Sequence, residues 1–238
     1  MTENYFKSLL RRRLFLRRMS GVVTVLGGAL ALGPPEVKAQ SGGGDSWKPA
    51  RHSEDDWMDA VPGVHRFLFD NTTYAGFGGA MRFANNFMRV NRDAYGLEDN
   101  DLAVIIVARH FSTPFAFNDA MWERYGVPLA ARENIIDPKT DAPPTVNLLN
   151  TSGYGDELPT RGLMLKSLLD KGVRLAVCEV AARGAAGRVA RAVGGDADSI
   201  FEEFTRNLVD NAHLVPAGIV AVNRAQERGY TFSFVDFA

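Results

Sequence analysis

The sequence predicts a single α/β domain of three layers, in which helices flank a central, mostly parallel sheet of five strands. Residues 102–108 are continuously apolar (Leu-Ala-Val-Ile-Ile-Val-Ala), as is typical of a strand buried on both faces of a parallel sheet. Apolar residues recur at helical spacing between Tyr74 and Tyr95, which predicts an amphipathic helix. Other apolar strands alternate with helical stretches along the chain. This alternation indicates parallel strands joined by right-handed crossovers.

The first two strands and the helix between them have clear sequence boundaries. Val64–Phe69 is the first expected strand. Thr72 or Thr73 can cap the helix that follows, and Gly96 can end it. The apolar run at 102–108 is the second strand.

The next helix is expected to begin at Thr113 and Pro114 and to run to about Tyr125, because a capping hydroxyl followed by proline is a typical start signal. The remaining expected elements are a helix over 158–171, a strand over 173–178, helices near 180–193 and 199–211, a strand over 213–215, a helix over about 217–228 and a strand over 230–235. Tyr230, Phe232 and Phe234 share one face of the last strand, which we interpret as core. If that strand lies at the sheet edge, the same face can instead form part of a subunit interface.

Two segments fall outside this alternation. Residues 40–60 begin with Gln, Ser and three glycines and are otherwise polar, which predicts a flexible leader before a domain over 61–238. Residues 126–157 are rich in Pro, Asn, Asp and Gly. A loop of about 30 residues in a compact domain is usually functional or disordered.

The composition excludes several classes of protein. The chain has 238 residues, 27 Lys and Arg against 28 Asp and Glu, and a single cysteine. One cysteine forms neither an intrachain disulfide nor a cysteine-rich metal cluster. The near-zero net charge argues against a nucleic-acid partner. His65 and His213 fall at strand beginnings, at the edge of the sheet opposite to His110, so we expect no metal site.

A dinucleotide cofactor is not expected either. Gly76-Phe77-Gly78-Gly79 follows a strand, but Met81 stands where the third glycine of G-x-G-x-x-G belongs. These glycines lie inside the predicted helix, and we interpret them as positions of close helix packing.

The first 39 residues predict an export signal. They carry seven basic residues and two acidic ones, and residues 19–33 are uncharged and apolar. Such a run is too short to span a membrane and suits a signal peptide. Arg12-Arg13-Leu14-Phe15-Leu16 resembles a twin-arginine translocation signal; an ordinary secretory signal or a basic membrane anchor are the alternatives.

Cleavage is expected after Ala39, since Val37-Lys38-Ala39 has the small-x-small pattern of a signal peptidase site. We therefore expect the twin-arginine export machinery as a partner, a periplasmic location and no stable membrane anchor after cleavage. The remaining chain has 20 basic and 26 acidic residues, a net charge of −6.

Polar residues gather where the expected strands end, the edge at which open parallel sheets bind ligands. Cys178 stands where a buried strand meets a helix, and the positive helix end favours the thiolate. The alternative is a buried cysteine that acts as a small apolar residue. His110 stands at the matching end of another strand and is the second catalytic candidate, since it would lie near Cys178 if the two strands are adjacent. Arg109 is expected either to bind an anion or to pair with an acid.

Asn71 and Asn150 are the further candidates for substrate binding. Asn71 follows the first strand, and Asn150 lies in the long loop. Asn147, Ser152 and Tyr154 of the same loop are weaker candidates.

Several segments of residues 61–238 resemble the DsrE/DsrF-like family of sulfur-relay proteins. The resemblance rests on residues 104–111 leading into 114–122, on Lys171-Gly172-Val173 leading to Cys178, and on Val215-Pro216-Ala217-Gly218 leading to Gly229-Tyr230. It implies an α/β fold, a homo-oligomer and a cysteine at position 178 that binds sulfur as a persulfide and passes it on, with His110 assisting. A sulfur donor or acceptor protein would be the partner, and no cofactor is implied.

The resemblance leaves two functions open. One is an exported sulfur carrier that uses Cys178. The other is a non-enzymatic periplasmic module for small-ligand binding or assembly, in which this cysteine is structural.

Overall fold

The computed structural model describes residues 48–236. The expected signal peptide and the first part of the expected leader lie outside the described residues. The described chain forms an α/β domain with a five-stranded sheet, in which every strand is parallel to its neighbours and the order is β4-β3-β2-β1-β5. The strands are β1 (His65–Asn71), β2 (Leu102–Ala108), β3 (Arg174–Cys178), β4 (Ala212–Val215) and β5 (Thr231–Phe234).

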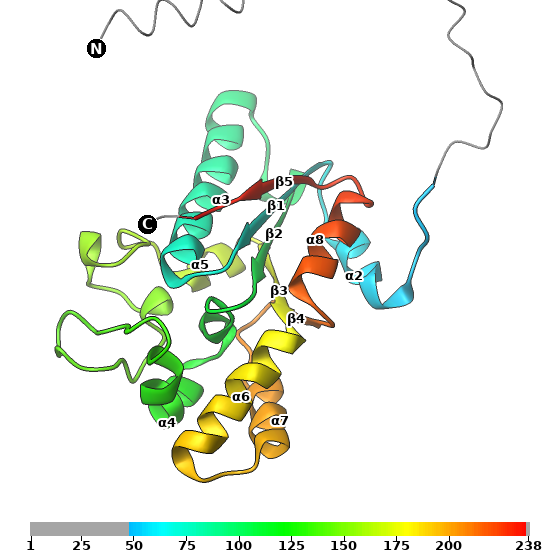
Figure 1. Ribbon diagram of the computed structural model, residues 1–238. Helices are drawn as coiled ribbons and strands as arrows, with labels where there is room; N and C mark the ends of the chain where they lie inside the picture. Colours follow the sequence, from blue (N-terminus) through cyan, green and yellow to red (C-terminus); the bar gives the residue numbers. More distant parts are fainter. Residues whose placement is uncertain (1–47, 237–238) are drawn as a thin grey trace, which may run out of the picture. The chain divides into compact units, whose positions relative to one another are not determined.

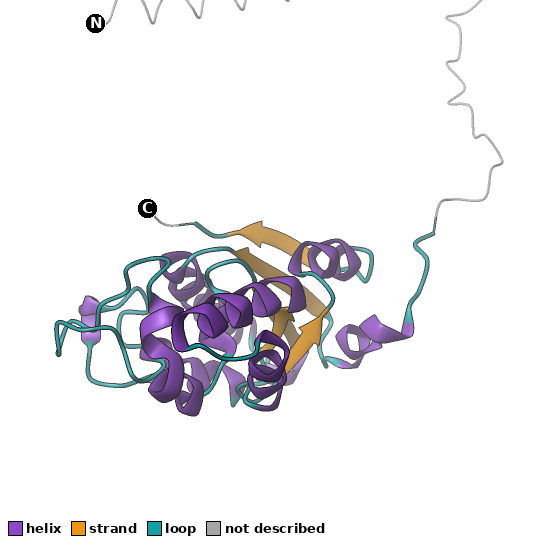
Figure 2. Ribbon diagram, turned by 60° about the horizontal axis from the view of Figure 1, so that its bottom comes forward, coloured by secondary structure: helices purple, strands orange, loops and turns teal. Residues whose placement is uncertain are grey.

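Helices cover both faces of the sheet, so the predicted three-layer α/β fold is confirmed (Figures 1 and 2). The helices are α2 (Asp56–Ala60), α3 (Tyr74–Tyr95), α4 (Asp119–Ala130), α5 (Leu165–Leu169), α6 (Glu179–Val193), α7 (Ala197–Arg206) and α8 (Gly218–Gln226). Side chains of α3 to α7 share one apolar core with one face of the sheet, and α2 and α8 share a second core with the other face. Strand β2 lies in the middle, and all seven of its residues are buried, which explains its uninterrupted apolar sequence.

The connections between strands change faces once. The segments after β1, β2 and β3 pass over the face covered by α3 to α7, whereas α8 follows β4 across the opposite face and leads to β5 at the far edge. The chain therefore leaves β3 and β4, which are neighbours, in opposite directions. Such a point opens a crevice at the carboxyl ends of the strands, where open α/β sheets bind ligands.

Several predicted boundaries are confirmed to the residue. Helix α3 runs from Tyr74 to Tyr95, with the Thr73 hydroxyl accepting a hydrogen bond from Gly76 N and Gly96 ending the helix in a left-handed conformation. Strand β2 also has the predicted bounds.

The helix predicted from Thr113 to Tyr125 is wrong as one element. Thr113–Ala116 form a single 3₁₀ turn, and α4 begins only at Asp119. Between them, Phe117 is extended and pairs with Leu208 in an isolated antiparallel bridge. This contact with a segment about 90 residues away interrupts the helix, which then continues past Tyr125 to Ala130.

The helix predicted over 158–171 is also shorter in the structure, where only Leu165–Leu169 are helical. Arg161 and Gly162 have positive φ values of 51° and 81°. Backbone in that region does not continue a right-handed helix, so the helix begins after this turn.

The long loop at 126–157 packs against the domain core. Leu148, Leu149 and Tyr154 are buried. The buried Asn147 side chain donates hydrogen bonds to the carbonyl oxygens of Phe115 and Phe117 at 2.9 and 3.0 Å. The loop therefore has a structural role as a cover over the extended segment that precedes α4.

The interpretation of Tyr230, Phe232 and Phe234 as one core face is right only for the first of them. Tyr230 is buried, but Phe232 and Phe234 are 41% and 47% exposed. Strand β5 lies at the edge of the sheet, so these two rings are available for the subunit interface considered above.

The expected flexible leader does not extend to residue 60. Residues 53–55 form a 3₁₀ turn and α2 follows, with Met58 fully buried in the second core. The Tyr230 hydroxyl donates to Met58 O at 2.7 Å, and the Trp57 ring stacks on His213 with 4.2 Å between centroids. Burial lowers the pKa of His213. Because the segment is polar overall, its sequence did not predict that Trp57 and Met58 would pack against the domain.

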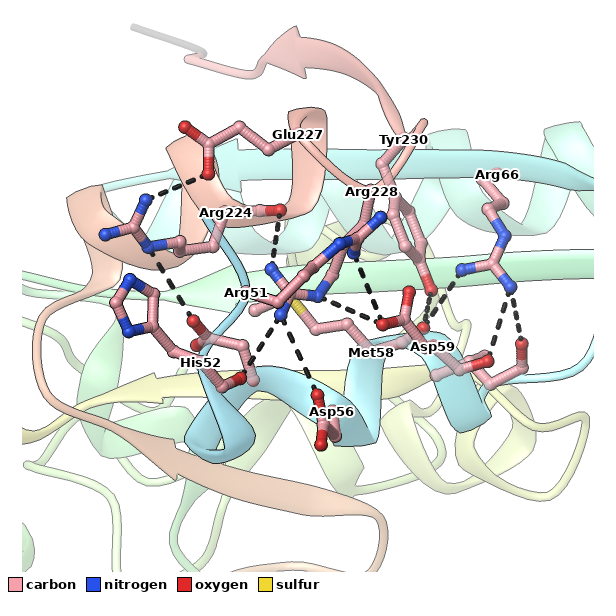
Figure 3. Close-up of polar contacts among 12 residues, drawn as sticks. Arg51, His52, Asp56, Met58, Asp59, Arg66, Arg224, Glu227, Arg228 and Tyr230 are labelled. Atoms are coloured by element: carbon pink, nitrogen blue, oxygen red, sulfur yellow. Dashed lines mark hydrogen bonds and ion pairs between the residues drawn. The ribbon is translucent and has the colours of Figure 1, made fainter. Parts of the chain in front are cut away.

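A buried arginine joins this segment to α8 (Figure 3). The Arg228 side chain is fully buried. Its Nη atoms donate to the carbonyl oxygens of His52 and Arg224 at 3.3 and 3.4 Å. Its Nε lies 3.3 Å from Asp59 Oδ2, an ion pair whose geometry is not that of a hydrogen bond. The guanidinium therefore joins the carbonyl oxygens of His52 and Arg224 to the Asp59 carboxylate.

Replacing Arg228 with alanine is expected to lower the free energy of unfolding by about 3 kcal/mol, because it leaves a cavity and two carbonyl groups without their donors. Arg228→Met fills most of the cavity and should cost less. Arg206→Ala is the control: this side chain is 69% exposed and pairs with Glu202 only at the surface, so a loss of less than about 1 kcal/mol is expected. Denaturant unfolding of the three variants measures the series. Equal stability of Arg228→Ala and Arg206→Ala would contradict it.

Candidate functional site

A pocket of about 270 Å³ lies at the crevice between the ends of β3 and β4. Pockets for drug-sized ligands measure about 300–1,000 Å³, so this one suits a small molecule. In the described part of the chain, its lining combines apolar, cationic and thiol groups without an acidic side chain. The lining residues are Arg109, His110, Phe111, Arg132, Cys178, Val180, Ala181, Gly184, Arg188, Ala217, Gly218 and Ile219. The pocket thus brings together the two predicted catalytic residues and one predicted substrate-binding residue.

Cys178 is the last residue of β3 and the N-cap of α6. It is a free thiol, 6% exposed, and its side chain makes no capping hydrogen bond. The first N–H groups of a helix have no partners within the helix and carry partial positive charge. The sulfur therefore lies at the positive end of a 15-residue helix, in the place that the sequence predicted.

His110 reaches the pocket through an unusual backbone conformation. Its φ is 56°, a left-handed value in which histidine is enriched among non-glycine residues. The turn is held on both sides, since Ser112 N donates to Arg109 O and Phe111 N donates to Thr72 O. The imidazole is exposed at the pocket and meets the Phe111 ring at an angle of 62°.

Arg109 takes the second of its two expected roles, that of an ion-pair partner. Its Nε and Nη2 donate to the two carboxylate oxygens of Asp70 at 2.7 and 2.8 Å. The hydrogen bond to Asp70 raises the pKa of Arg109. A Cβ at Gly218 would lie 2.7 Å from Arg109 Cβ, so the arginine stem fits directly under the start of α8. Arg109 therefore lines the pocket as part of an ion pair, and Asp70 neutralises its positive charge.

The other two substrate-binding candidates lie outside the pocket. Asn71 is fully buried at the end of β1, and its amide donates to Val107 O at 2.9 Å. Asn150 Oδ1 accepts from Lys166 N at 2.8 Å and so joins the long loop to α5. The pocket lies at the ends of β2, β3 and β4, so neither amide reaches it.

The weaker candidates in the loop also have structural partners. Asn147 holds the segment before α4, as described above, and the Tyr154 hydroxyl donates to Asp137 at 2.9 Å. Ser152 does not line the pocket.

Two arginines of the pocket were missed by the sequence analysis. Arg132 follows α4, and its guanidinium lies 4.7 Å from the centre of the Phe111 ring. Arg188 lies on α6, and its Nη1 is 3.5 Å from the position of a Cβ on Gly184. The helical spacing of Ala181, Gly184 and Arg188 would have placed all three on one face of the helix, whereas nothing local predicts the approach of Arg132.

The interpretation of the Gly76–Gly79 segment as a packing position agrees with the structure. A Cβ at Gly78 would lie 2.5 Å from Pro159 Cβ, and one at Gly76 would lie 2.8 Å from Val235 O. Among residues 48–236, no group of three or more metal-ligating side chains occurs and no helix is long and apolar enough to cross a membrane.

No model of a known protein family matches the chain, and no curated protein matches it. Among solved structures, it is similar to the protein of unknown function MTH1491 from Methanobacterium thermoautotrophicum, at 15% sequence identity and a TM-score of 0.31, over 71% of this chain and 98% of that one. A similarity at this level supports no inference about function.

Proposed function

We propose that this protein is an exported sulfur carrier in which Cys178 accepts sulfane sulfur as a persulfide. The observation that carries the proposal is the position of the thiol: it belongs to the N-cap residue of the 15-residue helix α6 and lines a small pocket together with His110 and three arginines. Thiolates are the nucleophilic form of cysteine, and helix N-termini and cationic neighbours favour them. The resemblance to DsrE/DsrF-like proteins and the twin-arginine pattern of residues 12–16 support the same proposal.

The transfer step balances without a cofactor. The Cys178 thiolate attacks the outer sulfur of a donor such as thiosulfate, a sulfur–sulfur bond forms to Cys178, and the donor's own sulfur–sulfur bond breaks. Sulfite leaves with the electron pair of that bond. An acceptor thiolate then attacks the outer persulfide sulfur and releases the Cys178 thiolate. In this proposal His110, which lines the same pocket, takes the thiol proton before the first step.

A second candidate is a non-enzymatic module that binds a small ligand. Cys178 is only 6% exposed and the pocket walls are largely apolar, which favours a binding role with an inert thiol. The same pocket serves both candidates, so reactivity of the thiol separates them.

The rate of native alkylation tests the proposal. In the folded protein, iodoacetamide is expected to label Cys178 without unfolding, because the thiol lines a pocket at a helix N-terminus. Intact mass against time measures this rate, and the same protein in denaturant gives the reference. Labelling that occurs only after unfolding would favour the ligand-binding module.

We also propose a homo-oligomer and transient contact with a sulfur-donor or sulfur-acceptor protein. The exposed Phe232 and Phe234 rings on edge strand β5 support a self-association surface. Light scattering coupled to size-exclusion chromatography reports the oligomeric state.

A further inference from the structure

Two arginines besides Arg109 line the pocket, Arg132 and Arg188. Among residues 48–236, neither of them forms an ion pair with a carboxylate, in contrast to Arg109, which has Asp70, and no acidic side chain of these residues lines the pocket. Arginine presents a planar fork of donors that suits oxyanions.

Each of these two guanidinium groups lies against a neighbour in the pocket. That of Arg132 lies 4.7 Å from the centre of the Phe111 ring. That of Arg188 lies beside Gly184, where a Cβ would be at the ordinary contact distance of 3.5 Å from its Nη1. Burial and the positive charges of Arg132 and Arg191 lower the pKa of Arg188. Like charges held together cost free energy that a bound anion would offset.

The rest of the pocket favours an apolar substituent on that anion. Phe111, Val180 and Ile219 contribute to its walls. Val180 and Ile219 are 66% and 60% exposed, so they leave an apolar rim at which a bound group can bury surface. The N–H groups at the start of α6 add to the positive potential near the sulfur.

We propose that Arg132 and Arg188 form an oxyanion-binding site, and that the sulfur donor is a small organic thiosulfonate whose sulfonyl oxygens bind to these arginines. The assignment of thiosulfonates as sulfur donors rests on the proposed function of Cys178, whereas the anion-binding site does not. The step balances: the Cys178 thiolate attacks the terminal sulfur, the bond from that sulfur to the sulfonyl sulfur breaks, and a sulfinate leaves with the electron pair. One anion enters with the donor and one leaves as the sulfinate.

Titration calorimetry on the full chain carrying Cys178→Ser tests the site with an unreactive probe, benzenesulfonate. Binding is expected, and the neutral isostere benzenesulfonamide should bind about tenfold more weakly or worse. Arg132→Gln and Arg188→Gln should each raise the dissociation constant about tenfold or more, since hydrogen bonds to charged groups are the strong ones. Sulfate, which has no apolar part, should bind more weakly than benzenesulfonate.

Arg191→Gln is the matched control. Arg191 lies on the same helix and belongs to the same positive cluster, but it does not line the pocket. The Arg191→Gln substitution removes the same charge as Arg188→Gln. It is expected to change the dissociation constant for benzenesulfonate by less than about twofold, because salt screens charges at long range. An effect of Arg191→Gln as large as that of Arg188→Gln, or unchanged binding in both pocket variants, overturns the site. Sulfate binding as tight as benzenesulfonate overturns the organic donor class.

Failure of this inference is distinguishable from failure of the proposed function. If Cys178 accepts sulfur equally well in Arg132→Gln, Arg188→Gln and the parent chain, this result contradicts the arginine site and supports the carrier function. If benzenesulfonate binds through the arginines but Cys178 accepts sulfur from no donor, the carrier function and the donor class fall while the anion site stands.

Discussion

Substitution of Cys178 with serine is expected to abolish sulfur transfer from thiosulfate to an acceptor thiol, with sulfite release falling to the rate seen without protein. Cys178 is the only cysteine in the chain, so no second thiol can form the persulfide or take over the sulfur. Serine keeps the approximate size of the side chain, but it has no sulfur atom on which a persulfide can form. Sulfite release over time, with a small thiol as acceptor, measures the effect.

His110→Asn provides the graded comparison. The imidazole is exposed at the pocket and its backbone turn is held by Phe111 and Ser112. Asparagine tolerates the left-handed backbone of residue 110, so the variant is expected to fold normally. If His110 takes the thiol proton, its loss should slow transfer about 100-fold near neutral pH, within the usual range for a general base. Sulfite release that continues at the parental rate in Cys178→Ser would show that the chemistry lies elsewhere.

Replacing Asp70 with asparagine is expected to lower the free energy of unfolding by about 3 kcal/mol. The Asp70 side chain is 2% exposed and that of Arg109 is 14% exposed, and two short hydrogen bonds join them. Removing one partner of a buried ion pair leaves the other charge without compensation, which commonly costs about 3–5 kcal/mol. We expect the lower end of this range because Arg109 retains some contact with solvent. Thermal and denaturant unfolding both measure the loss.

Asp170→Asn is the matched control for that substitution. Asp170 pairs with Lys166 one helical turn away, and both side chains are about 60% exposed. Exposed pairs contribute about 0–1 kcal/mol, so the control is expected to unfold close to the parent chain. Because Gly218 packs on the Arg109 stem, Asp70→Asn should also loosen the start of α8. A variant as stable as the control would mean that the buried pair contributes little.

The sequence was sufficient to predict those elements whose limits depend on local signals. Strand β2 was recognisable because both of its faces are apolar, and α3 because a capping threonine and a terminal glycine flank a regular pattern. The prediction of one helix from Thr113 was wrong because Phe117 pairs with Leu208, which is too distant in the sequence for a local pattern to reveal the contact. The prediction of a flexible leader up to residue 60 was wrong for a related reason, since Met58 and Trp57 pack against residues in distant parts of the chain.

The candidate site was partly predictable for the same physical reason. Cys178 ends one strand of the parallel sheet, Arg109 and His110 follow another, and carboxyl ends of parallel strands share an edge. Asn71 ends β1, but its side chain is buried, so the same rule included a residue that the pocket does not use. The pairing of Arg109 with Asp70 joins residues on neighbouring strands, and sequence spacing left both of its roles open. Arg132 arrives from a loop whose path depends on tertiary packing.

The central claim is that Cys178 carries sulfur, and the intact mass of the full folded chain after incubation with a sulfane-sulfur donor tests it most directly. We expect a gain of one sulfur atom, its removal by a reducing thiol, and no gain in Cys178→Ser. A folded chain that gains no sulfur from thiosulfate, benzenethiosulfonate or polysulfide, while a known persulfide-forming protein is loaded in the same mixture, would contradict the claim.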